Sequence, residues 1–267
     1  MDLGIVSDEI APGFREALNY GTSWGITKYE IRTLKTGRVP NVEHREIQEV
    51  LDGIRSEGVE ISALSPGMFK MPVTNQAEIR RQLDVLLPDT IRIAEKFGTQ
   101  KLIVFGFQRN PGEPSENLKL AVDYLGEATE IAKKAGMTLL IENEPGFWCD
   151  TGTNTASILS EISSPALRAN WDPCNAFGLD EEPFPDGYAA VKEFVANVHV
   201  KDTRKGALVE CVPVGEGLID WRGQLRALLE DRLVEHVTIE THSLPLVEKS
   251  KRNVDVLRTL LSEFKGT

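Results

Sequence analysis

Three carboxylates and one imidazole stand at or near the ends of apolar segments in the second half of the chain. The segments are 138–143, 167–172, 195–200 and 236–241, and the polar residues are Glu142, Asp172, His199 and Glu240. Any one of them alone is commonly an ordinary strand-end polar group. If the segments are neighbouring buried strands, however, their charges would repel one another, and a divalent cation would remove the conflict. The pattern therefore predicts a metal site.

The donor set indicates which ion the site would take. Oxygen ligands combined with one histidine favour Mn2+, with Mg2+ and Co2+ as further candidates. Zn2+ also accepts carboxylate and imidazole ligands. We predict one bound divalent ion, with Mn2+ as the first choice.

The choice between the two glutamates of IENE rests on the alternation of side chains along a strand. Glu142 and Glu144 point the same way if the strand continues through both. Glu144 precedes Pro145, and we expect it to lie already in the loop. Glu142 is therefore the predicted ligand, and Glu144 is expected to support the ligands or face the substrate.

Strand-like and helix-like segments alternate along the whole chain. The other apolar, strand-like segments are 3–7, 28–32, 59–65 and 101–106. Helical patterns cover 12–20, 42–57, 76–97, 116–135, 154–162, 186–194, 221–231 and 246–264. Pro88 should kink or break the third helix, and Gly58, Gly98 and Gly136 are expected to be left-handed caps.

Eight strands and eight helices in 267 residues predict an α/β fold, a (β/α)8 TIM barrel that forms a single domain over 1–267. The alternative is an open, doubly wound sheet. The first strand is followed by SDEIAPG rather than by a glycine-rich phosphate turn, which favours the barrel. In a barrel the carboxyl ends of all strands meet at one mouth, so the four polar groups would lie close together.

Composition narrows the classes of partner. The formal net charge of -11 disfavours nucleic acid. The chain has no apolar run of membrane-spanning length, and MDLGIVSDEI does not resemble a signal peptide. Its three cysteines lack CxxC spacing and are expected to be reduced thiols. We expect a cytoplasmic protein with a small-molecule ligand and no nucleic-acid or membrane partner; a homo-oligomer is left open.

Five pieces of the second half, IENEPG, NWDPCNA, NVHVKD, VGEGLIDW and IETH, resemble the xylose isomerase-like superfamily. This superfamily contains sugar isomerases and epimerases, and also endonuclease IV-type DNA repair enzymes. The resemblance implies one divalent metal held by Glu, Asp, His and Glu, which fall here on the four residues identified above. It also implies proton transfer next to a sugar carbonyl through an enediolate, with Glu142 and Glu240 as the acid/base pair.

The chain departs from its relatives in two ways. Many relatives have a histidine at the position of Asn175. Endonuclease IV-type members use additional histidine and carboxylate ligands for three zinc ions, and this chain has only four histidines, His44, His199, His236 and His242. The resemblance thus implies a metal-dependent isomerase or epimerase of carbohydrate metabolism. A sugar or cyclitol dehydratase is the alternative, and a DNA repair endonuclease or a non-enzymatic binding barrel is less favoured.

Several residues near the ligands are candidates for substrate binding. They are Lys201, Asn175, Glu144, Glu30, His242 and Trp148. Lys201 and His242 each follow a ligand by two residues and share its direction if the strand continues. The alternative for Lys201 is a salt bridge with Asp202 or Glu216.

Other residues near strand ends are open to two readings. Arg32 could join Glu30 in binding hydroxyls or acidic groups of a substrate. Arg204 is expected to be a solvated loop charge. Phe107 could join Trp148 in an apolar wall against a sugar ring or chain. Trp171 is expected in the core, and Asp220 and Trp221 are expected to cap and anchor the seventh helix.

Overall fold

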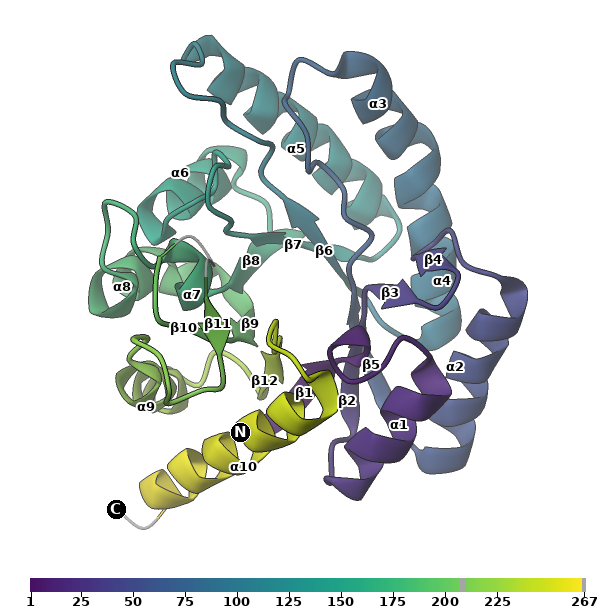
Figure 1. The fold of residues 1–267 in the computed structure, drawn as a ribbon. Helices are drawn as coiled ribbons and strands as arrows, with labels where there is room; N and C mark the ends of the chain where they lie inside the picture. The colour runs from purple at the N-terminus through teal and green to yellow at the C-terminus, as the bar shows by residue number, and fades with distance from the viewer. Residues whose placement is uncertain (207–209, 266–267) are drawn as a thin grey trace.

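The computed structural model describes residues 1–206 and 210–265. Its central element is a closed barrel of parallel strands, which Figure 1 shows ringed by helices. In barrel order from the N-terminus the strands are β1 (Asp2–Val6), β2 (Lys28–Ile31), β5 (Glu60–Leu64), β6 (Lys101–Phe105), β7 (Thr138–Glu142), β8 (Leu167–Trp171), β9 (Val195–Val200) and β12 (His236–Ile239). The last strand pairs with β1, from Asp2 opposite His236 to Ile5 opposite Ile239. This closure confirms the predicted TIM barrel and excludes the open sheet.

Helices cover the outer face of the barrel. They are α1 (Phe14–Ser23), α2 (His44–Glu57), α3 (Gln76–Arg81), α4 (Leu87–Phe97), α5 (Glu116–Lys134), α6 (Gly152–Ile162), α7 (Pro173–Ala176), α8 (Tyr188–Val191), α9 (Trp221–Asp231) and α10 (Leu246–Lys265). The main hydrophobic core lies between this layer and the strands. Within the part of the chain that the structure describes, no helix is both long and apolar enough to cross a membrane.

Two predicted helices are irregular. The helix predicted over 76–97 contains a π-helical turn at Gln82–Leu86, just before Pro88. Proline lacks the amide hydrogen that regular helical bonding needs, and the wider turn accommodates it. The helix predicted over 186–194 is regular only in α8, because the preceding Pro183–Gly187 turn contains an extended Phe184 (φ −138°, ψ 127°) and Lys192–Phe194 forms a 3-10 turn.

The predicted glycine caps are confirmed. Gly58 and Gly98 end α2 and α4 with φ of 66° and 75°, and Gly136 follows α5 with φ of 70°. Each has the left-handed conformation that glycine adopts without steric cost. These caps turn the chain from the helix layer back into β5, β6 and β7.

Alternation along each strand divides the barrel interior into layers. Ala63, Ile103 and Leu140 form a small apolar cluster of their own. On β7, Leu140 and Glu142 share the inward face, since they are two residues apart. Asn197 donates to Asn170 Oδ1 at 2.9 Å, which makes a polar layer. The carboxylates therefore lie at the end of a packed barrel and not in an open channel.

Two short hairpins that the sequence did not indicate extend beyond the strand ends. One consists of β3 (Thr33–Leu34) and β4 (Gly37–Arg38), and the other of β10 (Asp202–Thr203) and β11 (Cys211–Val212). Figure 1 shows β3 and β4 following β2, and β10 and β11 following β9. The β3–β4 hairpin brings Arg38 to the barrel mouth.

Candidate metal centre and active site

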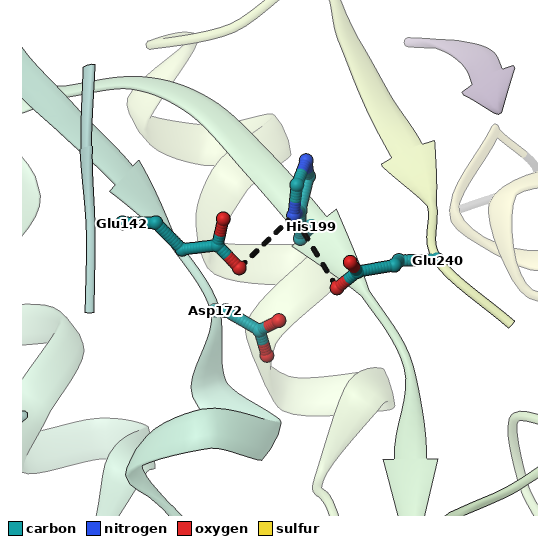
Figure 2. A group of neighbouring side chains, drawn as sticks. All are labelled: Glu142, Asp172, His199 and Glu240. Carbon is teal, nitrogen blue, oxygen red and sulfur yellow. Dashed lines mark ion pairs between the residues drawn. The ribbon is translucent and has the colours of Figure 1, made fainter. Parts of the chain in front are cut away.

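The four predicted ligands converge at the carboxyl ends of β7, β8, β9 and β12. One ligand atom from each of Glu142, Asp172, His199 and Glu240 lies within 4.8 Å of the other three. All four residues are buried, between 0% and 5% exposed. Figure 2 shows Glu142 and Glu240 on opposite sides of the group, with the His199 ring between them and Asp172 facing both. The geometry is that of a small cage of three carboxylates and one imidazole.

Local structure fixes Asp172. It is the N-cap of α7, and its Oδ1 accepts hydrogen bonds from the backbone amides of Cys174 and Asn175 at 2.9 and 3.1 Å. Pro173 suits the first helical position, where no amide hydrogen is needed. Because one carboxylate oxygen is held by the cap, the other, Oδ2, faces the cage.

A buried glutamate orients His199. The imidazole Nε2 lies 2.7 Å from Glu30 Oε2, and Asn197 donates to the other oxygen of Glu30 at 2.7 Å. This contact places the Nε2 proton on the Glu30 side. Nδ1 then faces Glu142 Oε1 at 3.4 Å and Glu240 Oε2 at 3.5 Å. A carboxylate behind a histidine is the usual support of a metal-binding imidazole.

The two glutamates of the cage are held unequally. Asn175 donates to Glu142 Oε1 at 3.3 Å. Arg32 donates to Glu240 Oε1 at 2.7 Å, and Lys201 donates to Glu240 Oε2 at 2.6 Å. Glu240 therefore has a cation on each oxygen, whereas the contact of Glu142 with Asn175 is longer and neutral.

Lys201 is part of the cage rather than of the neighbouring hairpin. Its ammonium lies 2.8 Å from Asp172 Oδ2 as well as 2.6 Å from Glu240 Oε2. The alternative salt bridge with Asp202 or Glu216 is wrong for the described residues. Asp202 instead accepts backbone amides of the loop after β11, and Glu216 pairs with Arg204 and Arg252.

The charged side chains of the cage shift one another's pKa values. Burial alone would raise the pKa of Glu142 and of Glu240, but the charges of His199 and Lys201 outweigh it and lower both values. Burial would lower the pKa of His199, yet Glu30, Glu142 and Glu240 raise it well above the usual range. Asp172 differs: burial raises its pKa to about 6 against the opposing charge of Lys201.

The residues fit a divalent ion. His199 Nδ1 is buried and has no hydrogen-bond partner among the described residues, and its position within the cage leaves it available as a ligand. Three carboxylates supply the negative charge that a divalent ion offsets. Glu142, Asp172, His199 and Glu240 would hold the ion.

A second group, Glu9, Glu240 and His242, also has one ligand atom from each residue within 4.8 Å of the others. It offers three ligands rather than four, and His242 is exposed, whereas all four residues of the first group are buried. We therefore place the candidate ion in the first group.

A pocket of about 460 Å3, open to solvent, lies over the cage. Of the predicted substrate-binding residues, it is lined by Lys201, Asn175, Glu144, Glu30 and His242. Asn175 Oδ1 is buried and has no hydrogen-bond partner among the described residues, so it could accept from a substrate hydroxyl. Glu144 lies in the loop after β7, as expected, and pairs with Lys70 at 2.8 Å.

Two predicted wall residues lie elsewhere. Trp148 lines a separate surface depression with Arg109, whose guanidinium lies 5.4 Å from the Trp148 ring. Phe107 is fully buried and packs against Phe69, with ring centroids 4.6 Å apart. The aromatic ring that does line the pocket is that of Phe105, at the end of β6. β6 ends at Phe105, and Phe107 lies beyond the strand with a φ of 62°, so the alternation of the strand does not set its direction.

The remaining expectations concerned the surroundings of the site. Trp171 is fully buried and donates to Gln224 Oε1 at 3.0 Å. Asp220 caps α9 by accepting from the Gly223 amide, and Trp221 donates to the Lys201 carbonyl at 2.9 Å. Arg204 is half exposed and pairs with Glu210 and Glu216, as a loop charge does.

Residues from the first half of the chain also line the pocket, although sequence reasoning missed them. These are Val6, Arg38, Ser65, Lys70 and Phe105. Glu9, next to the pocket, also escaped notice, although it follows β1 and the strand-end rule could have found it. Arg38 lies in a hairpin that no periodicity marks, so only the folded chain brings it to the site.

Comparison with known proteins agrees with this architecture. The family model described as xylose isomerase-like TIM barrel matches residues 20–260, which is most of the chain. No curated protein matches the chain.

Three solved structures illustrate the likeness of fold. The probable 3-DHS dehydratase AsbF from Bacillus anthracis has 15% identity and a TM-score of 0.82, covering 97% of this chain and 99% of that one. An L-ribulose 3-epimerase has 17% identity and a TM-score of 0.79, covering 98% and 95%. The IOLI protein with a bound zinc atom has 15% identity and a TM-score of 0.80, covering 98% and 97%. At such identities the likeness shows the shared fold.

Proposed function

The chain belongs to the xylose isomerase-like TIM barrel family, and we propose that it is a divalent-metal-dependent sugar isomerase or epimerase. The observation that carries the proposal is the cage in which ligand atoms of Glu142, Asp172, His199 and Glu240 lie within 4.8 Å of one another. The substrate would be a small sugar or sugar derivative bound in the pocket above the cage. The solved structures of the same fold include enzymes named for epimerisation and dehydration.

A divalent ion in the cage would supply Lewis-acid stabilisation of the negative charge that develops on a sugar carbonyl when a neighbouring carbon loses its proton. We propose Mn2+ as the ion, with Mg2+, Co2+ and Zn2+ as alternatives. The IOLI structure of the same fold contains zinc.

Glu142 and Glu240 are proposed as the proton-transfer pair. Both have lowered pKa values because of His199 and Lys201, so both are ionised at neutral pH and able to accept a proton. They lie on opposite sides of the cage (Figure 2). In epimerisation one carboxylate removes a proton from one face of a carbon, and the other, after taking up a proton from solvent, delivers it to the opposite face. Two facing carboxylates suit this task.

The other residues would position this pair and the substrate. Lys201 and Arg32 hold the two oxygens of Glu240 and fix its orientation. Glu30 holds His199, and Asn175 supports Glu142. We propose that Asn175, Glu144 and His242 contact substrate hydroxyls from the pocket wall.

The experiment that tests this function combines metal analysis with isotope exchange. Protein stripped of metal and reloaded with Mn2+ should hold about one equivalent. It should then exchange a substrate C–H for solvent deuterium, followed by NMR, with a panel of ketoses and inososes. A variant of an exposed residue far from the pocket, Glu127→Gln, serves as the control. An ion bound elsewhere, or no exchange with any member of the panel, would contradict the proposal.

Dehydration is the second candidate, and the likeness of fold to a probable 3-DHS dehydratase favours it. The same deprotonation next to a carbonyl can expel a hydroxyl group from the adjacent carbon. The product would be a conjugated carbonyl compound that absorbs ultraviolet light, whereas isomerisation or epimerisation gives none. Spectra of the reaction mixtures and product chromatography therefore separate the two reactions.

A further inference from the structure

One cation in the pocket wall lacks an acidic partner among the residues that the structure describes. Arg38, in the β3–β4 hairpin, is half-buried and lines the pocket. Its Nε donates to the Ser65 carbonyl at 2.8 Å and its Nη2 donates to Ser65 Oγ at 2.9 Å. Among residues 1–206 and 210–265, no carboxylate lies within 4.0 Å of this guanidinium, and its Nη1 has no hydrogen-bond acceptor.

The other cations of the pocket are paired. Arg32 contacts Asp8, Glu9 and Glu240. Lys70 contacts Glu144, and Lys201 contacts Asp172 and Glu240. Neighbouring carboxylates raise the pKa of Arg32 and Lys201, whereas burial and the charge of Arg32 lower that of Arg38. Asp8, Glu142 and Glu240 oppose this lowering only from beyond ion-pair distance, so none of them is a direct partner of Arg38.

Contacts with Gly67 and Ser65 hold the Arg38 side chain in place. Gly67 has φ of 76°, and a Cβ placed on it would lie 2.8 Å from Arg38 Nε and 2.9 Å from Cζ. The glycine lets the guanidinium pack directly against the backbone, and Ser65 holds two of its nitrogens. The group is therefore oriented without help from an acidic side chain, which leaves its remaining N–H groups for a ligand.

We propose that the substrate carries an anionic group, a carboxylate or a phosphate, and that Arg38 binds this group. The inference rests on the proposed function of the same pocket and names the class of its substrate. A partly desolvated cation is costly unless it is paired, and the planar guanidinium matches the oxygens of carboxylate and phosphate. An anionic substrate would complete the charge balance that the protein leaves open at this point.

Two sets of matched probes test the proposal on Mn2+-loaded protein. One set is dihydroxyacetone, hydroxypyruvate and dihydroxyacetone phosphate; the other is D-fructose, D-fructuronate and D-fructose 6-phosphate. Each set varies the end of the molecule between neutral, carboxylate and phosphate while keeping the hydroxyketone unit. Calorimetric titration should give an anionic member of at least one set a Kd at least about tenfold lower than its neutral analogue. The anionic probe with the lower Kd shows whether the substrate group bound by Arg38 is a carboxylate or a phosphate.

Variants assign the preference to Arg38. Arg38→Gln should abolish the difference between anionic and neutral probes by raising the Kd of the anionic probe more than that of the neutral one, and Arg38→Lys should retain part of the difference. Gly67→Ala keeps the charge but displaces the guanidinium, so it should also weaken the preference. Arg45→Gln, which changes an exposed arginine at the start of α2, should keep it. Circular dichroism of each variant confirms folding.

Several results would overturn the inference. These are equal binding of anionic and neutral probes by the wild-type protein, no binding of any anionic probe, or a preference that survives Arg38→Gln. Failure of the proposed function looks different: anionic probes would bind through Arg38, yet no C–H exchange or turnover would occur. Conversely, a protein that turns over neutral ketoses without any anionic preference keeps the proposed function and loses this inference.

Discussion

The two halves of the barrel mouth contribute different kinds of residue. Strands β7, β8, β9 and β12, from the second half of the chain, end in the four candidate ligands. The first half, from β1 to β6, contributes Glu30 and Arg32, which hold ligands. It also contributes Arg38, which lines the pocket and has no acidic partner within the described part of the chain. We therefore expect substitutions of the second-half ligands to abolish catalysis or metal binding. Substitutions in the first half should only lower the metal affinity or the activity.

The largest effect is expected for Glu240→Gln. Glutamine keeps the shape and one oxygen but cannot accept the proton, so activity at saturating Mn2+ should fall by about a hundredfold to ten-thousandfold. Deuterium exchange into the substrate separates loss of the proton-accepting group from weakened metal binding. Full metal binding with exchange at the wild-type rate would leave Glu240 as a ligand at most. Exchange without turnover would place it on the reprotonating side.

His199→Ala and Asp172→Asn should weaken metal binding and so lower metal-dependent stability. An ion bound only by the native state stabilises it by about 2.7 kcal/mol at a hundredfold excess over Kd. Thermal melts with and without Mn2+ should show this gain in the wild type and little of it in either variant. His44→Ala, which changes an exposed histidine at the start of α2, is the control. A gain in His199→Ala equal to that of the wild type would show that His199 is not a ligand.

Glu30→Gln tests whether the first half acts on the ligands. The change keeps a hydrogen-bonding group behind His199 Nε2 but removes the charge, so Mn2+ affinity should weaken by about tenfold to a hundredfold. Glu60→Gln provides the matched control, because Glu60 pairs with Lys28 at the amino end of the barrel strands. If Glu30→Gln binds Mn2+ like the wild type, the first half contributes only scaffold to the metal site.

A smaller effect is expected from pH. Without metal, burial raises the pKa of Asp172 to about 6, so the carboxylate is mostly ionised above this value and mostly protonated below it. Protons then compete with the metal, and Mn2+ affinity should be present at pH 7 and fall by about tenfold at pH 5. Titrations across this range provide the measurement. Asp172→Asn should flatten this part of the profile, and a wild-type affinity independent of pH would contradict the assignment.

Much of the second half could be predicted because its signals are local. Each ligand ends a strand whose apolar run is visible in the sequence, and strand-end residues of a parallel barrel meet at one mouth. Alternation gave Glu142 and Glu144 the same direction, and Pro145 indicated that Glu144 already lies in the loop; β7 does end at Glu142. The Asp172 cap was missed only because α7 spans four residues, Pro173–Ala176, too few to show a helical period.

Other features depended on contacts between residues far apart in the chain. Lys201 was expected to share the direction of His199, but only the closed barrel decided that its partners are Asp172 and Glu240 rather than the adjacent acids. Trp148 follows a strand by the same rule as the ligands, yet the turn after β7 carries it to a different depression. The direction of a side chain beyond a strand end depends on the loop, which periodicity does not describe.

The sequence by itself determined the alternation of strands and helices, the barrel and the four residues at its mouth, because burial and strand parity are local properties of the chain. The tertiary structure decided which charges pair. Arg32 reaches Glu240 across 208 positions of sequence, while Arg38, six residues after Arg32, has only Ser65 as its hydrogen-bonding partner among the described residues. Their different environments arise because the fold closes the first strand onto the last, and ion pairing depends on distance in space.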